Sequence, residues 1–216
     1  MNLFIGKALW FPEPEEALED GLVAIGGDLS VDRLLLAYRK GIFPWYNEGE
    51  IPMWYTPDPR FVLFPEELKV SKSMKQLLRK EVFEFRTNTD FAGVIRGCRE
   101  TYRPGQEGTW ISPEMMASYT KLHQLGYAHS AEAWQNGRLV GGLYGVRIGK
   151  MFYGESMFSQ VSNASKYAFI SYVSLLAAEG VKLIDCQVYT EHLESLGARP
   201  IARDQFLYLN DLYTQS

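Results

Sequence analysis

An acidic and an amide side chain lie two residues apart near the carboxyl end of the chain, at Asp185 and Gln187. The surrounding run 181–188 is mostly apolar, which predicts a strand. Side chains two residues apart on a strand point to the same face, about 7 Å apart along the chain. The two groups can therefore act together on one substrate group. The alternative is a buried aspartate that accepts hydrogen bonds only from backbone N–H groups.

A second candidate feature is the segment 41–60, which contains five aromatic residues and four prolines. Because proline fixes φ and removes a backbone donor, we expect this segment to be stiff and irregular rather than helix or strand. Such a segment can present flat rings to a flat ligand, or it can simply pack its rings on the domain beneath. The aromatic residues are Phe43, Trp45, Tyr46, Trp54 and Tyr55.

The composition is that of a globular chain, with 216 residues, 46% hydrophobic and 22% charged. No apolar run approaches the roughly 18–20 residues of a membrane span, and the first residues lack the pattern of a secretory signal, so we expect a cytoplasmic protein. Cys98 and Cys186 have no CxxC spacing and are expected to be reduced thiols. His123, His129 and His192 show no ligand or triad spacing, so we expect no metal site and assign them no role.

Charge is unevenly distributed, because residues 60–103 carry an excess of basic side chains whereas the segments before and after them are acidic overall. Within the basic part, residues 71–80 predict a short helix on which Lys72, Lys75 and Arg79 share one face. We call these three residues the basic face. A solvated helix surface explains it, and a polyanion site of modest size also fits.

Capping residues mark two helices. Ser30 and Gly41 bracket a helix over 31–40, and Ser112 and Gly126 bracket another that begins at a proline. In each case a side chain able to cap the first turn is paired with a glycine just past the last turn.

The second half of the chain predicts three strands, a helix and a further strand. Residues 127–135 and 138–147 form a hairpin whose Asn-Gly turn is of type I′, and a strand over 150–157 follows. Residues 163–179 are apolar nearly all round, which predicts a buried helix before the strand that carries Asp185.

This order of elements resembles that of the GNAT (acyl-coenzyme A N-acyltransferase) fold, whose members transfer an acyl group to an amine. Those enzymes bind the coenzyme A pyrophosphate on a glycine-rich turn at a helix N-terminus. The corresponding turn here, at 154–163, has no glycine after Gly154 and instead carries Glu155, Met157 and Phe158. We therefore do not expect coenzyme A as the acyl donor.

Six short motifs in order along the chain together resemble the leucyl/phenylalanyl-tRNA-protein transferase family. The motifs are 26–30 (GGDLS), 41–45 (GIFPW), 56–60 (TPDPR), 107–111 (EGTWI), 154–158 (GESMF) and 183–187 (LIDCQ). The resemblance extends from about Phe11 to Asn210 without a large gap. It implies an α+β protein, with a small N-terminal α/β domain at 1–60 that holds the aromatic and proline-rich segment, and a GNAT-like catalytic domain at 61–216.

The resemblance also implies an activity. Leucine or phenylalanine, and less well methionine, is transferred from aminoacyl-tRNA to the α-amino group of proteins that begin with lysine or arginine, which marks them for degradation by the bacterial N-end rule pathway. The aminoacyl ester is already activated, so the reaction needs no ATP, metal or redox cofactor. A peptide α-amino group has a pKa of about 7.7–8, so a modest base is enough. In the family, the carboxylate that matches Asp185 polarises the glutamine that matches Gln187, whose carbonyl oxygen accepts a proton from the incoming amine.

The donor amino acid requires an apolar pocket. The family positions that supply it, together with Gly154, are Phe152, Met157, Phe169, Leu176 and Ile184. Buried helix and strand residues of this kind are otherwise ordinary core, and strand alternation puts Ile184 opposite Asp185 unless a twist or bulge intervenes. Glu155 beside the pocket can bind the donor's free α-amino group, and the alternative for it is a surface salt bridge.

For the tRNA, Trp45 and Trp110 are expected near the terminal adenosine, with Tyr38 close by, because stacking on an aromatic ring suits a shared CCA end. The basic face would contact phosphates further along the tRNA. Two alternatives remain at this point: a coenzyme A dependent N-acetyltransferase, and a non-catalytic module that binds aminoacyl-tRNA.

Overall fold

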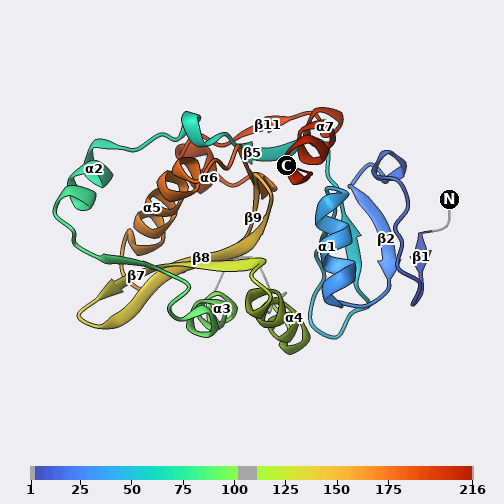
Figure 1. The fold of residues 1–216 in the computed structure, drawn as a ribbon, viewed down its shortest axis with the longest axis horizontal. Helices are drawn as coiled ribbons and strands as arrows, with labels where there is room; N and C mark the ends of the chain where they lie inside the picture. Colours follow the sequence, from blue (N-terminus) through green and yellow to red (C-terminus); the bar gives the residue numbers. More distant parts are fainter. Residues whose placement is uncertain (1–2, 102–110, 216) are drawn as a thin grey trace.

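The computed structural model describes residues 3–101 and 111–215, which form two β-sheets with helices around them (Figure 1). The smaller sheet has the strand order β1 (Phe4–Ile5), β2 (Leu22–Gly26), β4 (Met53–Tyr55), β3 (Phe43–Pro44). The larger sheet has the order β11 (Arg199–Ile201), β5 (Arg60–Leu63), β10 (Leu183–Gln187), β9 (Met151–Ser159), β8 (Arg138–Ile148), β7 (Ala128–Gln135), β6 (Glu84–Thr87). The mixed α/β class is confirmed.

Helices cover both faces of the larger sheet. On one face lie α3 (Phe91–Glu100) and α4 (Pro113–Gln124), and on the other lie α2 (Lys72–Arg79) and α5 (Ala164–Ala178) (Figure 1). Near the smaller sheet, α1 (Val31–Arg39) contacts β3, α4 and α7 (Arg203–Thr214), and α6 (Glu191–Ser195) follows β10. Two short 3-10 helices are η1 (Pro14–Glu16) and η2 (Pro65–Glu67). Over the residues that the structure describes, no helix has the length and apolar character needed to cross a bilayer.

Several predicted elements are confirmed together with their physical reasons. The Ser112 hydroxyl accepts a hydrogen bond from the Met115 N–H and caps α4, which ends just before Gly126. The β7–β8 hairpin turns at Asn136 and Gly137, both at positive φ, as a type I′ turn requires. Its neighbours β9 and α5 follow in the predicted order.

Three expectations differ from the structure. The Ser30 side chain does not cap α1, and its own backbone N–H instead donates to Asp28 Oδ1. The segment 41–60 is not wholly irregular, since β3, β4 and the start of β5 lie within it and the prolines fall at strand ends or between strands. The strand predicted over 150–157 is confirmed as β9, which continues to Ser159 because it pairs with β8. The turn before α5, which we expected over 154–163, is therefore shorter than predicted.

The strands β9 and β10 lie side by side in parallel but separate at one end. Their pairing runs from Leu183 with Met151 to Asp185 with Tyr153 and stops there, while β9 continues against β8. On its other side, β10 has an irregularity against β5 between Asp185 and Gln187, and Gln187 has a φ of 64°. A residue in this left-handed conformation turns the chain away from the strand direction. The divergence leaves room between the two strands at their carboxyl ends.

Candidate functional site

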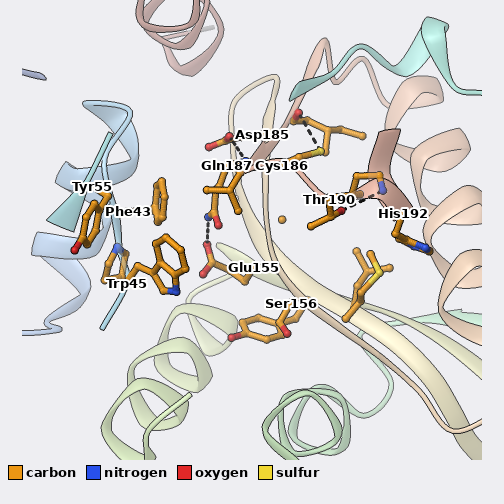
Figure 2. Close-up of a pocket in the computed structure, with 18 of the residues that line it drawn as sticks. Phe43, Trp45, Tyr55, Glu155, Ser156, Asp185, Cys186, Gln187, Thr190 and His192 are labelled. Carbon is orange, nitrogen blue, oxygen red and sulfur yellow. Dashed lines mark hydrogen bonds between the residues drawn. The ribbon is translucent and has the colours of Figure 1, made fainter. Parts of the chain in front are cut away.

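The carboxyl ends of β9 and β10 open into a cavity of about 870 Å³ (Figure 2). One wall comes from β3, β4 and the loop between them, and the opposite wall from α6 and the residues before it. The floor comes from β8, β9, β10 and α5. Both the expected catalytic pair and much of the expected donor pocket line this one space.

Asp185 lies at the bottom of the cavity and is held by Arg60. The Arg60 side chain donates from Nε to Oδ1 at 2.8 Å and from Nη2 to Oδ2 at 2.6 Å, and both side chains are buried, at 1% and 0% exposed. The guanidinium lies between the rings of Phe43 and Phe206, at 4.7 and 4.4 Å from their centroids. A planar, bidentate and stacked arginine of this kind fixes the carboxylate in one orientation.

Gln187 is positioned by Asp185 through the backbone. Its N–H donates to Asp185 Oδ1 at 2.9 Å, which supports the left-handed turn at Gln187. The side chain points into the cavity, where Nε2 donates to Glu155 Oε1 at 3.2 Å (Figure 2). The expected arrangement, two side chains on one strand face, is thus replaced by a bulge that turns the amide toward Glu155. Among the described residues, no side chain donates to the side-chain carbonyl oxygen of Gln187, Oε1.

Glu155 on β9 is a second carboxylate of the cavity, and Glu50 from the loop between β3 and β4 is a third. Tyr38 donates to its Oε1 at 2.6 Å and Tyr119 donates to its Oε2 at 3.0 Å. The pKa of Glu155 is raised to about 7, mainly by burial; the hydrogen bonds from the two tyrosines and Gln187 lower the pKa, and the charge of Asp185 raises it. The alternative of a surface salt bridge does not apply, because the partners of Glu155 are neutral.

Tyr38, expected close to the terminal adenosine, is buried beside Glu155. Its ring is 1% exposed and packs on Tyr153, at 4.8 Å between centroids. It therefore has no free face on which a base can stack, and its hydroxyl instead supports Glu155.

The predicted donor pocket divides into two groups. Met157, Phe169 and Ile184 line the cavity together with Gly154. Ile184 does so although it points away from Asp185, because the cavity lies where β9 and β10 separate. Phe152 and Leu176 do not line it: both are about 1% exposed and belong to the core around α5. For these two residues the core interpretation holds.

The aromatic residues of segment 41–60 also differ in exposure. Trp45 is 48% exposed at the rim of the cavity, with its ring edge on to Tyr55 at 5.8 Å (Figure 2). Trp54 is fully buried, packs on Phe11 and donates from Nε1 to a backbone carbonyl. Trp45 is therefore placed to meet a ligand, whereas Trp54 is core. Trp110 lies outside the described residues.

The basic face lies on α2 as predicted, and its three side chains are exposed while Met74 is buried beneath them. The helix packs against α5. The structure does not bring the basic face to the cavity, so any ligand that touches both must extend beyond the cavity.

Three residues of the site were not predicted from the sequence. Arg60 ends the TPDPR motif, and a lone basic residue before an apolar strand is a signal of a buried ion pair. Tyr119 lies within the predicted helix after Ser112, and its neighbours in the sequence do not distinguish it from an ordinary core residue. His192, to which no role was assigned, lines the cavity from α6, and burial lowers its pKa.

Comparison with known proteins identifies the family. The family model described as leucyl/phenylalanyl-tRNA protein transferase matches residues 62–211, and the model of its N-terminal domain matches residues 27–58. Proteins named leucyl/phenylalanyl-tRNA--protein transferase from Syntrophobacter fumaroxidans and Flavobacterium johnsoniae are 56% and 55% identical. Each match covers 94% of this chain, with 87% and 96% of the relative.

Solved structures are less similar. The structure of L-PGS from Bacillus licheniformis has a TM-score of 0.42 and 11% identity, covering 71% of this chain and 51% of that one, too weak a similarity to assign the fold. The sequence relatives and the two family models are decisive, and this chain belongs to the leucyl/phenylalanyl-tRNA-protein transferase family.

Proposed function

We propose that this protein transfers leucine or phenylalanine, and less well methionine, from aminoacyl-tRNA to the α-amino group of proteins with N-terminal lysine or arginine. The product would be a substrate of the N-end rule pathway in the cytoplasm. The observation that carries the proposal is the single cavity in which the buried Asp185, the half-buried Glu155, an apolar floor and an exposed tryptophan meet in a chain of this family. The ester is activated before it binds, so the proposal includes no ATP, metal or redox cofactor.

We assign the donor to the cavity in three parts. Its side chain rests on Met157, Phe169 and Ile184, where a flexible methionine suits two side-chain shapes. Its α-ammonium group binds Glu155 at the floor of the cavity, where the hydrogen-bond partners of the carboxyl group among the described residues are neutral. Its terminal adenosine stacks on Trp45 at the rim, a contact worth about 1–3 kcal/mol for a base on an aromatic ring. The basic face on α2 receives a more distant phosphate.

The chemistry is aminolysis of an ester. The acceptor amine attacks the carbonyl carbon, the new C–N bond forms, the bond to the ribose oxygen breaks, and that oxygen leaves with a proton. Gln187 accepts a hydrogen bond from the attacking amine through its carbonyl oxygen, while Asp185 holds the Gln187 backbone. Since an amide oxygen is a weak base, the gain comes from orientation of the amine toward the carbonyl.

We also propose a GNAT-like arrangement for residues 61–216 and a separate domain for residues 1–60. The support is the order of β8, β9, α5 and β10, with β9 and β10 parallel and separating at one end. Within the described residues, the smaller sheet draws its strands from positions 4–55, and β5 joins the larger sheet at Arg60.

The experiment is transfer to a defined peptide. The protein is incubated with Leu-tRNA and a peptide that begins with arginine, and mass spectrometry is used to look for one added leucine. The expected product is absent with an N-acetylated peptide and strongly reduced with Gln187→Ala. Acetyl transfer from acetyl-coenzyme A would favour the acetyltransferase alternative, and retained tRNA binding without a peptide product would favour a binding module.

A further inference from the structure

Glu155 closes a ring of hydrogen bonds with two buried tyrosines. The Tyr38 hydroxyl lies 2.6 Å from Oε1, the Tyr119 hydroxyl lies 3.0 Å from Oε2, and the two hydroxyls are also hydrogen-bonded to each other. Tyr38 comes from α1 and Tyr119 from α4, and both rings are buried. The ring therefore joins three elements at the wall of the cavity.

The number of hydrogens in the ring depends on the charge of Glu155. Three oxygen–oxygen contacts require three hydrogens, and two phenol groups supply two. With an ionised carboxylate, both hydroxyls donate to Glu155 and their oxygens face each other with no hydrogen between them. With a protonated carboxyl group, each of the three members donates once and accepts once. The observed ring is complete only when Glu155 carries a proton.

In the part of the chain that the structure describes, no cationic side chain is hydrogen-bonded to Glu155. The titratable and charged groups around it there are Tyr38 from α1, Tyr119 from α4, Tyr144 from β8, Asp185 from β10 and, beyond Asp185, Arg60 from β5. The Arg60 hydrogen bonds at this site go to Asp185, so they do not reach Glu155. Gln187 donates to Oε1 whether or not the carboxyl group is charged. A pKa near 7 for Glu155, raised mainly by burial, agrees with the hydrogen count.

We propose that Glu155 holds a proton in the empty site, that Tyr38 and Tyr119 are the positioning residues that fix the orientation of its carboxyl group, and that the α-ammonium group of the donor displaces the proton. The inference rests on the proposed function, which supplies a donor with a free α-amino group. When an ammonium group binds a protonated Glu155, an ion pair forms and one proton passes to the solvent. At higher pH, where the amine is neutral and Glu155 is ionised, formation of the same ion pair takes up one proton.

The test is calorimetric binding of a stable phenylalanyl-adenosine analogue with an amide in place of the ester. Titrations in buffers of different ionisation enthalpy give the number of protons exchanged. We expect release of about one proton per ligand near pH 6, and uptake of about one near pH 8.5, because the amine has a pKa of about 7.7–8. A matched analogue with a hydroxyl group in place of the α-amino group should exchange none at either pH.

Two variants separate this role from simple packing. In Glu155→Gln the side-chain N–H supplies the third hydrogen, so the ring and the melting temperature should be retained while proton exchange disappears. That variant should bind the amino ligand at least 10-fold more weakly and the hydroxyl ligand as the wild type does. In Tyr119→Phe the ionised form of Glu155 loses a charge-assisted hydrogen bond, which is stronger than a hydrogen bond to the neutral form. The pKa of Glu155 should therefore rise, and ligand binding should release a proton up to a higher pH than in the wild type.

Absence of binding by the amino ligand, or binding without proton release near pH 6, overturns the proposal. The same proton release by Glu155→Gln also overturns it, because the proton would then come from elsewhere. The proposed function is tested separately by the peptide product. Leucine transfer without proton release contradicts only the proposed protonation of Glu155, whereas absence of transfer contradicts the proposed function.

Discussion

The buried ion pair between Arg60 and Asp185 is expected to support both stability and turnover. Both side chains are at most 1% exposed and share two short hydrogen bonds. Removal of one partner from such a pair costs about 3–5 kcal/mol, because the other charge is left buried and unpaired. A chain of this size loses about 2–4 °C of melting temperature for each kcal/mol, so Arg60→Met should lower it by roughly 6–20 °C.

The double variant Arg60→Met/Asp185→Asn tests whether the loss is electrostatic. It leaves no unpaired charge, and methionine retains apolar contact with Phe43 and Phe206, so most of the lost stability should return. Turnover should not return with it. A neutral acceptor holds the Gln187 backbone less firmly, and misplacement of a reacting group by about 1 Å can cost on the order of 100-fold in rate.

The assay combines thermal unfolding with single-turnover transfer at saturating donor, well below each melting temperature. Arg33→Met is the matched control, because Arg33 is equally buried but bonds to backbone carbonyls of residues 6–8 and to the half-exposed carboxylate of Asp28, away from the cavity. It should lower stability without lowering the transfer rate of the folded protein. The reasoning is refuted if the double variant is no more stable than Arg60→Met, or if it transfers at the wild-type rate.

Three further predictions address the parts of the donor. Met157→Ala should change the ratio of phenylalanine to leucine transfer, within the limit of about 1–3 kcal/mol set by one apolar contact, whereas Leu176→Ala should lower stability and leave the ratio unchanged. Trp45→Ala should weaken binding of both a minimal aminoacyl-adenosine and full tRNA, and normal affinity for the minimal donor in a folded variant would show that the ring does not stack. Replacement of the basic face on α2 by alanine should spare the minimal donor, weaken full tRNA and flatten the plot of log affinity against log salt; an unchanged slope would exclude phosphate contacts there.

Local signals account for the parts of the fold that the sequence predicted. The Ser112 cap and the Asn136-Gly137 turn depend on a few adjacent residues, so they can be read without knowledge of the tertiary structure. The bulge at Gln187 could not be read in this way. It depends on hydrogen bonds that Asp185 makes with a neighbour along the chain and with Arg60, which is distant in sequence.

The same contrast applies to the site. Met157 and Leu176 are both apolar residues in buried elements, but Met157 lies on β9 beyond the point where β9 separates from β10 and lines the cavity, whereas Leu176 on α5 belongs to the core. Trp45 and Trp54 are both tryptophans of one segment, and pairing within the smaller sheet buries one and leaves the other at the rim. The residue types in the sequence predicted the kind of site, but the residues that line it are determined by the packing of the folded chain.

Asp185 and Glu155, two of the carboxylates that line the cavity, are each bound by a residue from the first 60 positions. Asp185 is ion-paired with the Arg60 guanidinium and orients the backbone of Gln187. Glu155 is bound by neutral hydroxyl groups, one of them from Tyr38, in a ring that is complete when the carboxyl group is protonated. Two acids in one cavity can have separate roles when their surroundings differ. We therefore expect the N-terminal part of the chain to contribute to the chemistry as well as to the wall of the cavity, since Arg60 orients Asp185 and Tyr38 orients Glu155.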